Sequence, residues 1–416
     1  MTSRETAAKL KSNIWIIYVA NFLKGLMFFL PIYALYLQQE LFTVFNVALI
    51  ISIQSVFVIL LEVPSGAIAD LFGRKNTLIV ANIVAIIALI FLSIGTSLIF
   101  FIGYAIFIAL SESLNSGTDI AILFDSIKNV NKEAKKEAIA LSKAAIESKT
   151  ITPLSTDIHF KKVIGINSSM WQIGASISAV IGGVLAGQYL RLPIYATIIP
   201  FILALILTFF ITEPQYQKEK HSNILTHISK SGKLFIKKKQ LLILFVAGFL
   251  FFAFGEVEHQ LNAIFFSFKG IPIEYFGLIF ALIFGLSSLG FLISHAVSSK
   301  FGNKSTVIIS EILSILLIFI ATLTFGIWTS ILIIISSLFW GIRGPIITHL
   351  TNLETASKNR ATIISIGNLG NRLGLAICVP IFGIISDIYN INFVFQLTSG
   401  LSFTAVFVLL FLKDKN

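Results

Sequence analysis

The sequence predicts an all-α integral membrane protein whose twelve transmembrane helices form two pseudo-symmetric six-helix bundles. Hydrophobic residues make up 56% of its 416 residues and charged residues only 12%, whereas soluble proteins carry roughly 25% charged residues. The apolar residues fall in runs of about 20, which is the length a helix needs to cross a bilayer core of about 30 Å. A polar segment, residues 213–240, divides these runs six and six.

Each apolar run is expected to be one spanning helix, with ends that a sequence places to within a few residues. In the first half the runs are Ile14–Leu37, Val44–Ile68, Leu78–Ile94, Leu98–Ser116, Val163–Ala186 and Pro193–Thr212. In the second half they are Leu241–Phe266, Phe276–Val297, Thr306–Phe325, Ser330–His349, Ala361–Ile385 and Phe393–Leu412. Because basic residues precede a first run of full spanning length, we expect a retained anchor and no cleaved signal peptide.

Basic residues lie in alternate loops, which predicts the orientation of the chain. Nearly all of the 31 Lys and Arg residues fall in the terminal segments and in the loops that follow the even-numbered runs. The other loops carry only Arg191 and Lys269. Because cytoplasmic loops are enriched in Lys and Arg, both termini are expected in the cytoplasm. This distribution accounts for the net charge of +11 without nucleic acid as a partner.

An internal repeat supports the division into halves. The segment Leu71-Phe-Gly-Arg-Lys-Asn-Thr-Leu-Ile-Val80 aligns with Lys300-Phe-Gly-Asn-Lys-Ser-Thr-Val-Ile-Ile309, and each lies between the second and third runs of its half. We therefore expect an N-terminal bundle at 1–212, a cytoplasmic linker at 213–240 and a C-terminal bundle at 241–416. The Lys-rich segment 125–162 is expected to be a long cytoplasmic loop. Residues 132–149 of it form either an amphipathic helix on the membrane surface or a solvated linker.

Other classes of protein lack support in the sequence. The one cysteine, Cys378, lies inside an apolar run, so neither an intramolecular disulfide nor a cysteine metal site is expected. No Gly-x-x-x-x-Gly-Lys-Ser/Thr loop is present, which disfavours an ATP-driven pump. The chain also lacks the His-Glu-x-x-His and Gly-x-Ser-x-Gly patterns of an enzyme. We expect no enzyme activity, cofactor or metal.

The loop between the second and third runs carries the most specific pattern. It reads Gly66-x-x-x-Asp70-x-x-Gly73-Arg74-Lys75 and resembles the loop between helices 2 and 3 of the major facilitator superfamily of transporters, in its bacterial, twelve-span members. The resemblance implies a conformational role for this motif and a cavity lined by spans 1, 4, 7 and 10. It also implies a bacterial cytoplasmic (inner) membrane protein that works by alternating access and is expected to be a monomer.

Span five carries a glycine pattern with two interpretations. Gly165, Gly174 and the pair Gly182-Gly183 resemble the antiporter motif of the superfamily, but Ser178-Ala179 replaces its Gly-Pro. Small residues at this spacing also let helices approach closely, so packing alone explains the pattern equally well. The Arg that drug exporters of the family carry in span four is absent, which puts their proton-antiport mechanism in doubt here.

Ionisable residues inside spans are the candidates for the substrate cavity, because a charge in hydrocarbon is costly and is therefore kept for function. They are Lys24 with Asn21 one turn earlier, Glu112, Arg343 and Arg372. Glu112 and Arg343 occupy matching spans of the two halves, so an ion pair and separate contacts to one substrate are both open. Lys24 could instead extend toward the interface, and the two arginines could anchor neighbouring helices.

Span seven holds the candidates for proton coupling. Glu256 and His259 share a helix face, whereas Glu258 points roughly the other way with Asn262. A desolvated carboxylate can load and release a proton near neutral pH, and histidine titrates in that range. The alternative is that these residues lie at the external mouth and are solvated.

These observations predict a secondary active transporter that moves a small organic solute across the membrane. Proton coupling is expected, with efflux preferred over the alternative, uptake of a nutrient or metabolite. A membrane sensor or receptor that has lost transport is the rival from another class. The substrate itself stays open, because charges of both signs lie inside the spans.

Overall fold

A computed structural model describes residues 3–144, 156–214, 238–355 and 360–413. Its α-helices are α1 Ser3–Gly25, α2 Tyr33–Leu41, α3 Val44–Phe72, α4 Arg74–Ile94, α5 Leu98–Asn115, α6 Thr118–Ala144, α7 Thr156–Gln188, α8 Leu192–Phe209, α10 Lys239–Phe268, α11 Phe276–Phe301, α12 Asn303–Thr322, α13 Ile327–Glu354, α14 Arg360–Ile388 and α15 Ile391–Leu410. Two 3₁₀ turns, η1 Leu30–Ile32 and η2 Ile273–Tyr275, join α1 to α2 and α10 to α11. Within these residues, twelve helical segments are long and apolar enough to cross a membrane.

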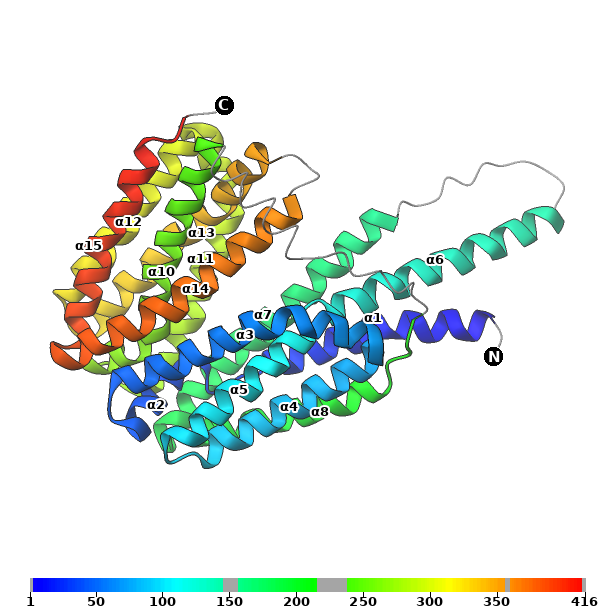
Figure 1. Ribbon diagram of the computed structural model, residues 1–416, viewed down its shortest axis with the longest axis horizontal. Helices are drawn as coiled ribbons and strands as arrows, with labels where there is room; N and C mark the ends of the chain where they lie inside the picture. The colour runs from blue at the N-terminus through cyan, green and yellow to red at the C-terminus, as the bar shows by residue number, and fades with distance from the viewer. Residues whose placement is uncertain (1–2, 145–155, 215–237, 356–359, 414–416) are drawn as a thin grey trace.

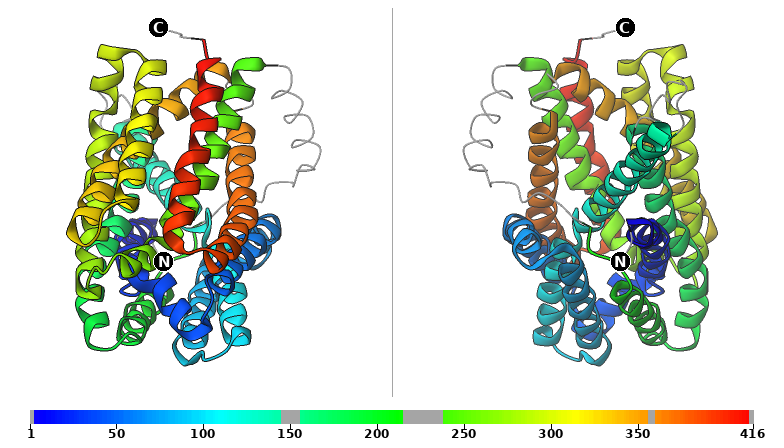
Figure 2. Two further views of the ribbon diagram at one scale, coloured as in Figure 1. Left: turned by 90° about the vertical axis from the view of Figure 1, so that its left-hand side faces the viewer. Right: turned by 90° about the vertical axis from the view of Figure 1, so that its right-hand side faces the viewer.

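The helices form two bundles that meet at one end (Figure 1). Helices α1 to α8 make the N-terminal bundle and α10 to α15 the C-terminal bundle. The bundles join near α2 and diverge toward the ends that carry the two chain termini. We call the first the joined end and the second the terminal end. Helices α3 and α14 lie side by side across the junction (Figure 2).

The structure corrects two predicted spans: the first is broken, and the fourth continues beyond its predicted end at Ser116. The first span comprises α1 and α2 with an interruption at residues 26–32, and the fourth comprises α5 and α6 with an interruption at Ser116–Gly117. Gly117 has a φ of 74°, a left-handed conformation that glycine adopts without strain. Discontinuous helices of this kind line the binding sites of many transporters.

The segment 125–162 is also more helical than a loop. Helix α6 runs on to Ala144, and α7 begins at Thr156, before the predicted start of span five at Val163. Residues 145–155, and most of the predicted linker 213–240, lie outside the described part of the chain. The choice between a surface helix and a solvated linker therefore remains a prediction.

Two contacts close the joined end. The carboxylate of Asp387, near the end of α14, accepts hydrogen bonds from the backbone N–H groups of Val44 (2.7 Å) and Phe45 (2.8 Å) at the start of α3. Glycines bring α7 and α11 together beside it. A Cβ atom on Gly277 would lie 1.9 Å from the carbonyl oxygen of Ala179, and one on Gly183 would lie 2.7 Å from the nitrogen of Gly277. Only glycine permits this approach.

The other glycines of span five also serve packing. A Cβ atom on Gly174 would meet the carbonyl oxygen of Phe22 at 2.3 Å, and one on Gly182 would meet that of Phe28 at 1.8 Å. A Cβ atom on Gly165 would meet nothing within 4 Å. The close approach of α7 to α1 and α11 therefore accounts for most of this pattern.

The sequence repeat corresponds to a repeated local geometry. Gly73 and Gly302 each stand between two helices with positive φ, 91° and 83°. In both copies the threonine four residues later donates its hydroxyl to the glycine carbonyl, at 2.8 Å for Thr77 and 2.7 Å for Thr306. The same turn thus links α3 to α4 and α11 to α12.

The two basic residues of the joined-end loops are both held within the protein. Arg191 donates to the carboxylate of Glu40 at 2.7 Å, and this hydrogen bond raises the pKa of Arg191. Lys269 is 2% exposed and donates to the carbonyl oxygen of Thr322 at 2.7 Å, at the end of α12. Burial lowers the pKa of Lys269. Both side chains thus bind groups near helix ends within the protein and do not extend into solvent.

Candidate substrate and proton sites

A cavity of about 430 Å³ lies where α1, α3 and α5 of the N-terminal bundle face α10 and α14 of the C-terminal bundle. Its lining includes three of the predicted residues, Lys24, Glu112 and Arg372. Aromatic side chains form much of the wall, among them Tyr33, Tyr104 and Trp171. The cavity is thus largely apolar with a few charged groups, as is usual for a small-molecule site.

Glu112 connects the two bundles. Its Oε1 accepts a hydrogen bond from Gln54 Nε2 of α3 at 2.8 Å, and its Oε2 lies 3.8 Å from a guanidinium nitrogen of Arg372 on α14. The Glu112 and Arg372 side chains are 40% and 42% exposed. A distance of 3.8 Å is longer than a hydrogen bond, so the pair is held loosely. A bound molecule can therefore reach both groups.

Lys24 stands at the break in the first span. It is the penultimate residue of α1, and its Nζ donates to Asn115 Oδ1, the last residue of α5, at 2.8 Å. The interruptions of spans one and four therefore meet at this contact. Asn21 lies behind it and donates to Asn167 Oδ1 at 2.7 Å and to Asp119 Oδ2 at 3.2 Å. Asn21 supports the site from outside the cavity lining.

A second cavity, of about 200 Å³, lies inside the C-terminal bundle among α10, α11, α12, α13 and α15. Arg343 on α13 forms a buried ion pair there with Glu311 on α12. Its guanidinium carbon lies 4.4 Å from the centre of the Phe251 ring, a cation–π contact. Glu258 lines the same cavity, is 8% exposed and accepts a hydrogen bond from Thr398 Oγ1 at 2.8 Å.

The three predicted proton-coupling residues all line this second cavity, although only two were expected to share a face. Glu256 accepts a hydrogen bond from Gln260 Nε2 at 3.2 Å and is half-buried. His259 packs edge-on against the rings of Phe280 and Phe284, each 6.3 Å away. Glu258 is the most deeply buried of the three.

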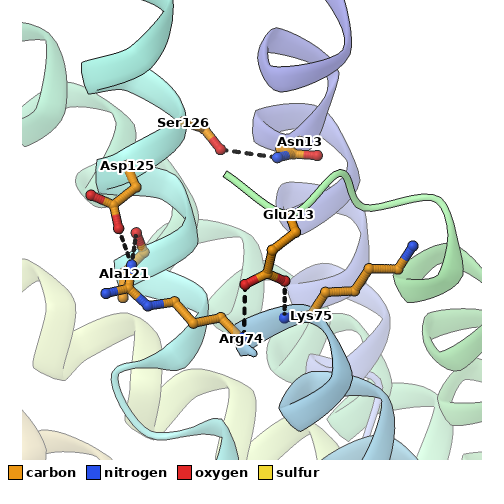
Figure 3. Close-up of polar contacts among 7 residues, drawn as sticks. All are labelled: Asn13, Arg74, Lys75, Ala121, Asp125, Ser126 and Glu213. Atoms are coloured by element: carbon orange, nitrogen blue, oxygen red, sulfur yellow. Dashed lines mark hydrogen bonds and ion pairs between the residues drawn. The ribbon is translucent and has the colours of Figure 1, made fainter. Parts of the chain in front are cut away.

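The loop motif forms a polar cluster at the terminal end of the N-terminal bundle (Figure 3). The guanidinium of Arg74 binds the carboxylate of Asp125 and, at 3.1 Å, the carbonyl oxygen of Ala121, both on α6. The carboxylate of Glu213 accepts hydrogen bonds from the backbone N–H groups of Arg74 (2.9 Å) and Lys75 (2.7 Å) and thereby caps the start of α4. Gly66 and Asp70 lie in α3, and the side chain of Asp70 lies outside the described part of the structure.

Comparison with known proteins identifies the family. The model of the Major Facilitator Superfamily matches residues 14–357 and 270–416. The chain belongs to the Major Facilitator Superfamily. It is therefore a multi-pass membrane transporter, in agreement with the resemblance found in the motif around Arg74.

Individual relatives of this superfamily member are distant. An uncharacterised MFS-type transporter of Bacillus subtilis (strain 168), YxaM, is 24% identical over 395 residues, which is 91% of each chain. The crystal structure of the nucleoside transporter NupG has a TM-score of 0.72 at 14% identity, covering 97% of this chain and 100% of its own. The peptide transporter POT in complex with sulfate has a TM-score of 0.70 at 14% identity, covering 99% and 97%. At such identities the likeness shows the fold alone.

The transporter fold separates the predicted cavity residues into two groups. Lys24, Glu112 and Arg372 share the cavity between the bundles, whereas Arg343 lies inside the C-terminal bundle. Of the two alternatives for Glu112 and Arg343, the ion pair is not formed, because Glu112 faces Arg372 and Arg343 binds Glu311. Glu311 itself was missed, although a carboxylate inside the run Thr306–Phe325 carries the same signal as Glu112.

Proposed function

We propose that this superfamily member is a secondary active transporter that moves a small organic solute and couples it to protons. The observation that carries the proposal is the cavity shared by both bundles, closed at the joined end by Asp387 and spanned by the pair of Glu112 and Arg372. Such a cavity becomes accessible from alternate sides when one bundle rocks against the other. Each chain holds a whole cavity, which supports a monomer as the working unit.

Charge distribution supports the proposed orientation and domain division. The joined end carries Arg191 and Lys269, whereas the other loops and termini carry nearly all remaining basic residues. We place the terminal end in the cytoplasm on this basis, so the cavity faces the cytoplasm in this conformation. The domains are the bundles at 1–212 and 241–416, joined by the linker 213–240.

The buried charges of the C-terminal bundle support proton coupling. Glu256, Glu258, Glu311 and Arg343 line one cavity, so three carboxylates lie there with one guanidinium group. Because an unpaired charge is costly in an apolar interior, binding one proton neutralises the group. Glu311 is already paired with Arg343, whereas Glu258 accepts a hydrogen bond from the neutral hydroxyl group of Thr398. Glu258 is therefore the proposed proton carrier, with Glu256 and His259 on the route to it.

The experiment is solute flux in proteoliposomes with and without an imposed pH gradient. Wild-type protein should accumulate a substrate when the gradient is present and lose this ability with a protonophore. Glu258→Gln should still exchange substrate across the membrane but should not accumulate it, because the amide has the shape of the carboxylate but cannot bind and release a proton. Glu256→Gln is the matched variant on the same helix and should retain at least partial accumulation.

Two outcomes would contradict the proposal. Protonophore-sensitive accumulation by Glu258→Gln would place the proton site elsewhere, with Glu112 the next candidate. Absence of flux for every class of solute would favour a sensor. The direction of the gradient that drives movement decides between efflux, which we propose, and the alternative, uptake of a nutrient or metabolite.

A further inference from the structure

We propose that the substrate of the cavity between the bundles is an organic anion of net charge −1, bound through its anionic group by Lys24 and Arg372. This inference rests on the proposed transport function. It follows from the balance of charge in the cavity, from the partners of each charged group and from the composition of the walls.

The charge balance of the cavity is positive. Its lining holds two cationic side chains, Lys24 and Arg372, against one carboxylate, Glu112. Asp119 acts electrostatically on Lys24 from behind the cavity wall, where the amide groups of Asn21 and Asn167 and the backbone N–H of Ile120 hold it, but it is absent from the lining. A solute of charge −1 therefore completes the balance within the cavity.

Lys24 is the cation best placed to receive an anionic group. The acceptor that its ammonium group contacts is the neutral amide oxygen of Asn115, at 2.8 Å. An ammonium group offers three donors, and a lysine held inside an apolar bundle is stabilised by a counter-charge. A carboxylate or phosphate oxygen of the substrate would supply this counter-charge, next to the ends of α1 and α5.

Arg372 offers the second contact, from the opposite bundle. Its 3.8 Å separation from Glu112 leaves its fork of N–H donors open to the cavity. Gln54 holds Glu112 from the other side at 2.8 Å, so the carboxylate keeps a partner when Arg372 turns to a ligand. An anion bound by both Lys24 and Arg372 would draw the two bundles together.

The walls indicate the rest of the molecule. Tyr33, Tyr104 and Trp171 present aromatic surface, while Gln260 and Asn82 add hydrogen-bonding amides. About 430 Å³ is within the usual range for small-molecule sites. We infer a compact anion with a planar or aromatic body. A cationic or neutral solute would leave the excess positive charge without compensation.

The test measures binding by thermal shift with the purified full-length protein, so that it does not depend on transport. The probes are matched sets of compounds with an aromatic ring: 4-hydroxyphenylacetate, its neutral amide and the cation tyramine, then phenyl sulfate against phenol, then tyrosine as a zwitterion. The anions should raise the melting temperature in a concentration-dependent way, with affinity at least tenfold above that of the matched neutral and cationic compounds.

Four variants sharpen the test. Lys24→Gln should weaken anion binding at least tenfold, and Lys24→Arg should restore most of it. Lys300→Gln, at the surface of α11, is the control and should bind as wild type does. Glu112→Gln should bind the anion at least as tightly, because it increases the positive excess, whereas a zwitterionic substrate would lose affinity in this variant.

The inference is wrong if neutral or cationic probes stabilise the protein as well as the anions do, or if no anion stabilises it. Unchanged anion affinity in Lys24→Gln also overturns it. Failure of the proposed function has a different signature. Anions would then bind with the stated preference, yet proteoliposomes would show no flux of any bound compound.

Discussion

Arg343 and Glu311 form an ion pair inside the C-terminal bundle, with side chains 9% and 4% exposed. Removing one partner of such a pair leaves an uncompensated buried charge, a cost of about 3–5 kcal/mol. Glu311→Gln should therefore lower the thermal stability of the purified protein markedly. Replacing both residues with leucine should recover most of the loss, since a buried pair and an apolar pair of similar volume differ little. A double variant no more stable than Glu311→Gln would show that Arg343 has another essential partner.

Helices α3 and α14 each carry an aspartate close to their C-terminal end, Asp70 and Asp387. Asp387 caps the start of α3 in this structure. By the superfamily resemblance, Asp70 is expected to approach the start of α14 when the cavity opens outward. During transport, the cap that Asp387 provides to α3 would then be replaced by a cap that Asp70 provides to α14.

We therefore expect Asp387→Asn to weaken closure of the joined end. Asparagine keeps an acceptor oxygen, so what is lost is the negative charge at the start of α3, worth about 0.3–1 kcal/mol, which shifts the ratio of the two states by roughly 2- to 5-fold. Accessibility of cysteines placed in the cavity to external reagents measures the shift. Asn390→Ala is the control, because Asn390 caps α15 within a single bundle. Equal accessibility in Asp387→Asn and wild type would argue that this cap has no part in closure.

The crossing of α7 and α11 gives a second prediction for the joined end. A Cβ atom on Gly277 would lie 1.9 Å from a backbone oxygen of α7, so Gly277→Ala should force the helices apart and increase external access to the cavity. Gly285→Ala on the same helix is the matched control, since its Cβ atom would meet nothing within 4 Å. Transport by Gly277→Ala at the wild-type rate would contradict a tight seal at this crossing.

At the scale of the whole molecule, the orientation in the membrane is the property to test. In a Cys378→Ala background, a cysteine at Asn76 should react only with reagents that reach the cytoplasm. One at Tyr389, which is 64% exposed at the joined end, should react with external reagents. The reverse pattern would invert the proposed topology and with it the expected direction of the cavity.

The amino-acid sequence determined the twelve spans, the all-α fold and most of the charged residues of both cavities. These follow from local properties, because the length of an apolar run and the cost of a charge within it do not depend on neighbouring helices. The loop motif around Arg74 was enough to indicate the superfamily. Glu311 was overlooked although the same rule applies to it.

Only the tertiary structure decided which charges meet. Helical periodicity places residues on a face of their own helix, but it does not say which helix packs against that face. Glu112 therefore faces Arg372, and not Arg343 as one of the two alternatives had it, and Glu258 lines the same cavity as Glu256. The break in span one and the continuation of span four as α6 were not predicted, although Pro31 and Gly117 are local signals of a helix end. Packing between the bundles gathers one group of ionisable residues around a cavity, and packing within the C-terminal bundle gathers the other.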